Sequence, residues 1–371
     1  MNINDFPEPF IPKKLPITFL REALMRDMHF MTHLVQNGRK LSEFVGYLQN
    51  LPNPNILISS LTLQEAVLSS RIEGTIATID DVVNQATTSD TIKNDIVEIE
   101  NYCDAIRYGH QELFERNRGL SKNLIKQLHV LLLEKNVRGA GKTPGEFKKE
   151  QNFIKNTVLG NFTPLPPILT DEYIDNLVDY IANENEISEL LQAAILHAQF
   201  EIIHPFKDGN GRVGRLLIPL FLYWKRVLPY PVFYISRYFA ENNDAYKERL
   251  SGISKGTSIE SQVDGWKNWL YFFFDGIASE SKRHIETSKQ ILNLYKEMIG
   301  AVNRTDMIAL IDLLFDELRL QPKDAIDKLS LPQTSVYREL QSLSAKGYLT
   351  RSGTERKTLY VFTKLIDIVQ Q

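Results

Sequence analysis

The sequence has very little cysteine: among its 371 residues there is one, Cys103. A single cysteine excludes an internal disulfide framework and agrees with a reducing compartment. Since a lone cysteine is more often a small buried side chain than a nucleophile, we interpret Cys103 as a structural residue.

Long apolar runs are also missing. The longest, Leu216 to Trp224, is far shorter than the roughly 20 residues that a membrane-spanning helix needs. The first 14 residues carry Asp5, Glu8 and three prolines before any apolar stretch, which is unlike a secretory signal. We therefore expect a cytoplasmic protein without membrane partners.

The chain has no large excess of charge of either sign. Its 43 Lys and Arg residues stand against 46 Asp and Glu residues, which gives a net charge of −3. A nucleic-acid contact would therefore need a local basic patch. The 43% of hydrophobic residues is typical of soluble globular proteins, and the length favours two or three folded units.

Most of the sequence predicts helices, so the expected fold class is mainly α. Apolar residues from Ile187 to Ile203 recur at helical spacing, and another helix should begin at Gly211 or Arg212. Residues 151–163 differ, because β-branched residues precede a Gly-Asn turn there and predict a short β-hairpin.

Three units are expected along the chain. An N-terminal helical region covers residues 1–94 and includes a helix at about 61–74. A central unit covers residues 95–300 and includes a long polar helix from Ser279 to Ile299. In residues 301–371 we expect three helices and then two strands, the order of a winged helix-turn-helix. The three helices are Met307–Phe315, Pro322–Lys328 and Gln333–Gly347, and the strands lie within Tyr348–Phe362.

The segment His204-Pro-Phe-Lys-Asp-Gly-Asn-Gly-Arg-Val-Gly-Arg215 concentrates reactive groups between the two central helices. The imidazole of His204 can accept a proton near neutral pH. Pro205 cannot extend the helix cleanly, so the chain turns there. Asp208 offers a hard oxygen ligand of the kind that Mg²⁺ prefers when phosphates complete its shell.

The second half of this segment favours an anion site. Gly209 and Gly211 lack the Cβ atoms that would keep main-chain amides away from an anion. The free amides of the next helix form an anion site by themselves. Arg212 and Arg215 are three residues apart, share one helix face and can both reach a polyphosphate.

Residues 209–214 also fit the G-x-G-x-x-G pattern of dinucleotide-binding folds, which alone is a weak signal. That interpretation needs a preceding strand, whereas the preceding segment predicts a helix. We therefore reject it.

The segment 204–215 matches every defined position of the signature His-Pro-Phe-x-[Asp/Glu]-Gly-Asn-Gly-Arg-x-x-Arg, and the chain resembles Fic-domain proteins over roughly residues 95–275. Shorter matches lie at His197–Phe200, Pro144–Phe147 and Trp266–Trp269. The resemblance implies a helical catalytic domain with a β-hairpin flap. It also implies an adenylyltransferase that moves AMP from ATP to Ser, Thr or Tyr hydroxyls of target proteins, or of itself.

The same resemblance assigns the roles of individual residues. His204 would be the general base, and Asp208 would hold Mg²⁺ between the α- and β-phosphates. Arg212 would meet the β-phosphate and Arg215 the γ-phosphate, and Gly211 favours AMP transfer because phosphorylating members tend to have Lys there. The implied nucleotide-binding residues are Gly209, Asn210, Gly211, Arg212, Val213, Gly214, Arg215 and Tyr246.

Two positions depart from the family pattern. Lys148 stands where the family often has Arg after Pro-Gly-x-Phe/Tyr. A Tyr-Tyr pair that bounds the adenine pocket in the family is Tyr246-Lys247 here. An ordinary core aromatic is therefore the alternative interpretation of Tyr246.

Ser69-Ser-Arg-Ile-Glu-Gly74 fits the inhibitory pattern [Ser/Thr]-x-x-x-Glu-[Gly/Asn] of the same family. Ser69 and Glu73 are four residues apart and share a helix face, and Gly74 is a natural helix stop. The resemblance implies that Glu73 pairs with Arg215 and occupies the space of the γ-phosphate. Some members use this glutamate to help remove AMP from the target, so a de-AMPylating activity stays open.

The tail supports a rival function, a DNA-binding or partner-docking regulator. Ser335, Tyr337, Arg338 and Gln341 could project from its third helix. Residues 338–364 hold six basic residues, Arg338, Lys346, Arg351, Arg356, Lys357 and Lys364, against Glu339 and Glu355. The expected partners are ATP, a protein target bound at residues 151–163 by strand addition, and DNA or a protein at the tail. A second copy of the chain is a further candidate.

Overall fold

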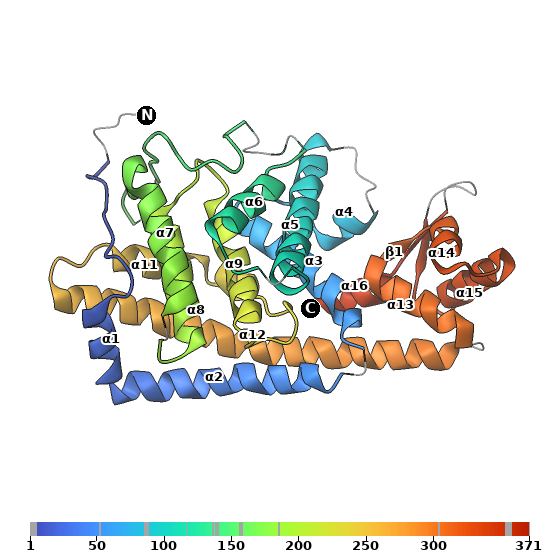
Figure 1. Ribbon diagram of the computed structural model, residues 1–371. Helices are drawn as coiled ribbons and strands as arrows, with labels where there is room; N and C mark the ends of the chain where they lie inside the picture. The colour runs from blue at the N-terminus through green and yellow to red at the C-terminus, as the bar shows by residue number, and fades with distance from the viewer. Residues whose placement is uncertain are drawn as a thin grey trace.

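The computed structural model describes residues 6–51, 53–84, 89–116, 118–135, 137, 141–155, 159–184, 186–302, 305–352 and 358–370. The fold is mainly helical with one small sheet, as the sequence predicts (Figure 1). Among the described residues, no helix combines the length and the apolar character that a membrane span requires.

The helices are α1 (Thr18–Met25), α2 (Met28–Gln49), α3 (Asn55–Ile72), α4 (Ile79–Asn84), α5 (Asp90–Phe114), α6 (Lys122–Leu132), α7 (Pro167–Asn183), α8 (Glu189–Ile203), α9 (Asn210–Trp224), α10 (Ser236–Glu241), α11 (Asn243–Ile253), α12 (Ile259–Ala301), α13 (Ile308–Glu317), α14 (Pro322–Leu329), α15 (Gln333–Ala345) and α16 (Thr363–Gln370). The strands are β1 (Arg319–Leu320), β2 (Thr350–Ser352) and β3 (Leu359–Val361).

Helices α8 and α9 pack against each other at the centre of the molecule and hold the segment 204–215 between them. Both are buried along nearly their whole length, as expected for core helices. Ser188 begins α8, because its hydroxyl accepts a hydrogen bond from the Leu190 N–H at 3.0 Å. The two buried helices thus fix both ends of the connecting loop.

Helix α12 has 43 residues and lies beside α2 along one side of the molecule (Figure 1). A capping box between Ser258 and Ser261 begins it. The long polar helix predicted for residues 279–299 is the second half of this single element. The first half was not predicted as part of the helix, since Trp266–Trp269 was interpreted only as a motif.

The C-terminal unit contains the three predicted helices, α13, α14 and α15, each within two residues of the expected bounds. Its antiparallel sheet has the order β1-β3-β2, with Val361 opposite both Arg319 and Thr350. Strand β1 and helix α16 were not predicted, and residues 353–357, between the two expected strands, lie outside the described residues. The winged-helix classification stays a prediction.

One proposed recognition residue of the C-terminal unit is placed differently. Tyr337, Arg338 and Gln341 are exposed on α15, as expected, whereas Ser335 is buried. Ser335 precedes the buried Val336 in the first turn of α15 and faces the interior of the unit. Ser335 therefore cannot project toward a partner.

The predicted flap at residues 151–163 is reduced to one antiparallel pair within the described residues. Ile154 and Phe162 exchange two main-chain hydrogen bonds of 2.9 Å. The predicted flap residues 156–158 lie outside the described part of the chain. The segment is hairpin-like, but it contributes no named strand.

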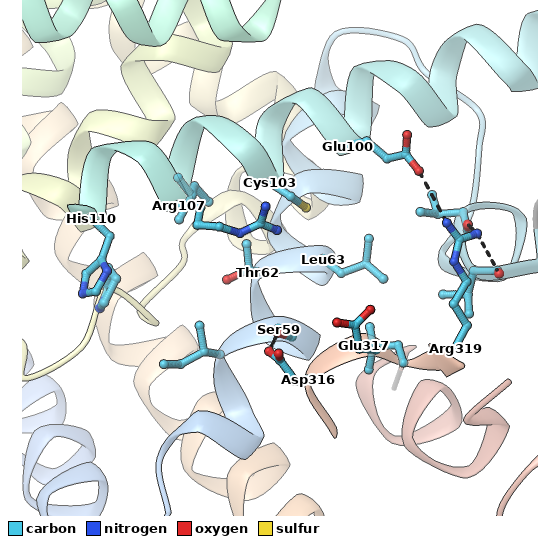
Figure 2. A pocket seen from close by; sticks show the side chains of 16 residues that line it. Ser59, Thr62, Leu63, Glu100, Cys103, Arg107, His110, Asp316, Glu317 and Arg319 are labelled. Carbon is cyan, nitrogen blue, oxygen red and sulfur yellow. Dashed lines mark hydrogen bonds and ion pairs between the residues drawn. The ribbon is translucent and has the colours of Figure 1, made fainter. Parts of the chain in front are cut away.

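The C-terminal unit packs on α3 and α4. The Ser59 hydroxyl of α3 donates to the Asp316 carboxylate of α13 at 2.8 Å. The Arg319 guanidinium donates to the carbonyls of Val82 and Val83 at 3.2 Å each. A pocket of about 270 Å³ lies at this junction, between α3, α5 and the C-terminal unit (Figure 2).

Cys103 lines this junction pocket (Figure 2). Burial raises the pKa of its thiol to about 12. The reactive thiolate is therefore negligible at neutral pH. This agrees with the interpretation of Cys103 as a structural residue.

Candidate active site

His204 ends α8 in the left-handed conformation, with φ 50° and ψ 60°. Its imidazole borders a cavity of about 580 Å³ that the flap segment also lines. Burial, and then the positive charge of Lys148, lower the pKa of His204 to about 4. The imidazole is therefore neutral at physiological pH and able to accept a proton.

Asn210 closes the loop that follows His204. Its Oδ1 accepts from the Phe206 N–H, and its Nδ2 donates to the Phe206 carbonyl, both at 2.8 Å. Asn152 of the flap segment donates to the same carbonyl at 2.7 Å. The Asn210 amide thus shapes the loop, and the nucleotide-binding role that the family resemblance implies for Asn210 stays a prediction.

His129 of α6 supports the loop from the other side. Its Nδ1 accepts from the Gly145 N–H at 2.9 Å, so Nε2 carries the proton and donates to the Asp208 carbonyl at 2.9 Å. The ring stacks on Phe206 with a centroid distance of 3.8 Å. Gly209 has φ 76°, which favours glycine, and brings the chain against this imidazole.

Asp208 carries a cation partner. Its Oδ2 lies 2.9 Å from the Lys142 ammonium, and its Oδ1 accepts from the Gly209 N–H at 2.7 Å. Burial alone would raise the pKa of Asp208, but these two partners hold it below its ordinary value. The carboxylate is ionised and fits a cation.

A metal site made of protein ligands alone is not found in the described part of the chain. No group of three or more His, Cys, Asp or Glu side chains gathers there. Asp208 would supply one carboxylate ligand. This fits a Mg²⁺ ion whose other ligands are phosphate oxygens and water.

Arg212 forms a buried ion pair with Glu98 of α5. The two groups are 3.0 Å apart, and only 1% and 2% of their side-chain surfaces are exposed. Glu98 was not among the predicted site residues. The available signal was the helical spacing of Asp95, Glu98 and Tyr102, which places three polar side chains on one buried face of α5.

Arg215 is held by the C-terminal end of α3, as the sequence predicts. Its Nε donates to the Ser69 hydroxyl at 2.8 Å, and its guanidinium lies 2.7 Å from a Glu73 carboxylate oxygen. The same guanidinium donates to the Ser69 carbonyl at 3.1 Å. Gly74 then ends the helix with φ 97°. The predicted pairing of Glu73 with Arg215 is therefore present.

The Glu73 carboxylate also lies against the first turn of α9. A Cβ atom placed on Gly211 would be 2.3 Å from Glu73 Oε1. Burial raises the pKa of Glu73, but the charge and hydrogen bond of Arg215, together with the charge of Arg212, outweigh it and hold that pKa below its ordinary value. A helix N-terminus favours an anion, so Glu73 occupies the position that suits a phosphate.

Two further acidic residues lie near Arg215 and were missed. Glu65 of α3 accepts from the Ser236 hydroxyl at 2.5 Å and from the Tyr102 hydroxyl at 3.1 Å. The Glu201 carboxylate of α8 lies against the Cα atom of Gly214. Burial raises the pKa of Glu65 and of Glu201 to about 7 each.

Tyr246 belongs to a buried aromatic cluster. Its hydroxyl lies 2.9 Å from His197 Nε2, and its ring stacks on Phe239 at 4.4 Å. Val213 and Gly214 are likewise buried, where α9 packs on α8. The structure thus brings together His204, Asp208, Arg212, Arg215, Ser69 and Glu73, whereas adenine contacts of Tyr246 stay a prediction.

Two family models match the chain, that of the Fic/DOC family N-terminal region over residues 31–111 and that of the Fic/DOC family over residues 119–222. A probable protein adenylyltransferase of Aquifex aeolicus (strain VF5) is 28% identical over 185 residues, which are 49% of this chain and 51% of that protein. The protein adenylyltransferase fic-1 of Caenorhabditis elegans is 39% identical over 66 residues, 17% of this chain and 13% of its own length. The chain therefore spans about half the length, or less, of these curated relatives.

Solved structures share the fold. A Fic family protein from Desulfovibrio desulfuricans G20 superposes with a TM-score of 0.56 at 20% identity, over 89% of this chain and 95% of that chain. A Fic domain containing signaling protein from Bacteroides thetaiotaomicron VPI-5482 gives a TM-score of 0.56 at 23% identity, over 69% of this chain and 96% of its own.

Proposed function

Because the chain belongs to the Fic/DOC family, we propose that it transfers AMP from ATP to hydroxyl groups of proteins, with His204 as the general base. The observation that supports this most is the neutral imidazole of His204 beside the N-terminus of α9, where Arg212 and Arg215 project from the same helix. A proton acceptor and an anion site lie side by side there.

The reaction forms a bond between the target oxygen and the α-phosphorus and breaks the bond between that phosphorus and the oxygen that bridges to the β-phosphate. Pyrophosphate leaves, and the hydroxyl proton passes to His204. A phosphate anion near the ring favours the imidazolium, so bound ATP would raise the pKa of His204 from about 4. General-base catalysis of this kind contributes about 10²–10⁴ in rate.

The polyphosphate would be held by the free amides at the N-terminus of α9 and by the guanidinium groups of Arg212 and Arg215. Asp208 is the residue that would hold Mg²⁺, and the ion when bound neutralises phosphate charge. Lys142 would then give up its ion pair with Asp208. Preorganised charge of this kind is the main means by which proteins accelerate such transfers.

We also propose that Glu73 inhibits this reaction. Its contact with Arg215 and with the first turn of α9 takes the partner and the space that the γ-phosphate needs. The resting protein would therefore bind ATP poorly or unproductively and show low activity.

Mass spectrometry after incubation with ATP and Mg²⁺ tests both proposals. Glu73→Gly should raise AMP incorporation on the protein itself or on lysate proteins, because it frees Arg215. In the same background, His204→Ala should lower the rate by about 10²–10⁴. If Glu73→Gly binds ATP and modifies neither substrate, AMP transfer is excluded for them.

We propose that a target segment binds at residues 151–163 by strand addition, supported by the antiparallel Ile154–Phe162 pair beside the His204 cavity. The exposed Tyr337, Arg338 and Gln341 support a separate contact of α15 with DNA or a protein. Binding of the full chain to duplex DNA that weakens as salt rises would favour DNA. No binding at low salt would leave a protein partner.

A further inference from the structure

Lys148 is a buried lysine that contacts the main chain on both sides of His204. The residue is only 4% exposed, and its ammonium donates a hydrogen bond to the Ile203 carbonyl at 3.0 Å. Its own main-chain N–H donates to the Pro205 carbonyl at 2.8 Å. One residue thus binds the peptide groups that precede and follow the proposed base.

Both contacts meet a need of the local backbone. The last carbonyls of α8 have no partners within the helix, and a cation is favourable at that end. His204 adopts a left-handed conformation that a residue with a Cβ atom keeps only where its surroundings impose it. The Lys148 ammonium supplies the partner, the charge and part of this constraint.

Packing alone does not explain a lysine here. Burial lowers the pKa of Lys148 to about 7, so this site disfavours a charged side chain. An apolar side chain of similar length would fill the space without that desolvation cost. The chain nevertheless places an ammonium at this point, directed at the turn that carries His204.

We propose that Lys148 is a positioning residue for His204: by binding the carbonyls of Ile203 and Pro205, it sets the direction in which the imidazole meets the target hydroxyl. The inference rests on the proposed AMP transfer. Its charge has a second effect, because it favours the neutral imidazole. The other groups near the ring are the carboxylates of Glu73 from α3 and Asp208 from the loop, which act in the opposite direction.

The test compares Lys148→Met and Lys148→Arg in the Glu73→Gly protein. We expect Lys148→Met to lower kcat for AMP transfer by about 10- to 100-fold, since small misplacements of a reacting group have effects of this size. The KM for ATP should change less than about 2-fold, because ground-state binding is not altered. Lys148→Arg keeps a charged donor and should restore most of kcat.

NMR titration of the histidine rings provides a readout that does not need activity. The signal of His204 is assigned by its loss in His204→Gln. In Lys148→Met its titration should move to higher pH, because a neighbouring positive charge is gone. Lys126→Met is the matched control: the Lys126 ammonium lies over the Phe147 ring at 4.3 Å instead of on the carbonyls beside His204, so both readouts should stay unchanged.

An unchanged kcat together with an unmoved His204 titration would overturn the proposal. So would a lower melting temperature with an unmoved titration, because Lys148 would then only stabilise the fold. If Lys148→Met does not fold, Lys148→Gln replaces it, since it keeps a donor without the charge. If Glu73→Gly transfers no AMP, the proposed function fails, and the titration still decides the effect of Lys148 on His204.

Discussion

At the scale of single residues, the site is defined by charges whose partners come from distant parts of the chain. Arg212 pairs with Glu98, Arg215 with Glu73, and Asp208 with Lys142. The first pair is fully buried, whereas the Glu73 side chain is 35% exposed and the Lys142 side chain 47%. In these two pairs one partner reaches solvent, and they are the two pairs that ATP and a cation would replace.

The buried pair of Arg212 and Glu98 makes a prediction about stability. Glu98→Ala should lower the free energy of unfolding by about 3–5 kcal/mol, because it leaves a guanidinium buried without its partner. Arg212→Leu combined with Glu98→Leu should be less destabilising than Glu98→Ala alone. Urea unfolding measures both, and equal losses in the two proteins would show that the lost charge pair is not the cause.

Glu65 makes a prediction about pH. Its pKa is raised from an ordinary 4.5 to about 7, so the folded protein keeps a proton that the unfolded chain releases. Between about pH 4.5 and 7, stability contributed by this group must therefore fall as the pH rises. Glu65→Gln should remove that loss, so its gain in melting temperature over the parent protein should be larger at pH 8 than at pH 5.

At the scale of elements, the sequence predicted what local patterns can specify. The helical periodicity gave α8 within two residues of its start and α9 within one or two. The four-residue spacing of Ser69 and Glu73 correctly predicted that both side chains lie on one face at the end of α3. The hairpin and α12 were less well predicted, because pairing in the flap and the joining of two helical stretches depend on tertiary contacts.

What the sequence could not predict is the support of the loop. Lys148, His129 and Asn152 all hold residues 203–208, yet each lies more than fifty positions away along the chain. No local spacing relates a donor on one element to a carbonyl on another. Only the folded arrangement of α6 and the flap segment brings them to the turn between α8 and α9.

The role of Asn210 in holding this turn can be tested by mutation. Asn210→Ala removes the acceptor of the Phe206 N–H and one donor to the Phe206 carbonyl, to which Asn152 still donates. The buried N–H that is left unpaired costs about 1–3 kcal/mol. In the Glu73→Gly background we expect a lower melting temperature and a loss of AMP transfer. A variant that kept full activity would show that the loop conformation does not depend on this side chain.

At the scale of the whole molecule, α3 is shared by two units. Its C-terminal end carries Ser69 and Glu73 at the active site, and its N-terminal half contacts the C-terminal unit through Ser59 and the junction pocket (Figure 2). Gln64 of α3 also donates to the Val369 carbonyl of α16. The proposed inhibitory helix thus depends on residues 305–370 for part of its packing.

Arg319 is the side chain at this junction that can be tested most directly. It donates to two carbonyls at the end of α4, and its guanidinium lies 3.9 Å from Glu100 of α5. Arg319→Ala should lower the free energy of unfolding by about 1–3 kcal/mol, because two hydrogen bonds are lost and each has a net contribution of about 0.5–1.5 kcal/mol.

If the units support each other, amide hydrogen exchange in Arg319→Ala should become faster in α4 and α3 as well as in the C-terminal unit. Lys323→Ala, a charge removal on the exposed side of α14, is the control. Faster exchange confined to the C-terminal unit would mean that α3 keeps its place at the active site without this contact.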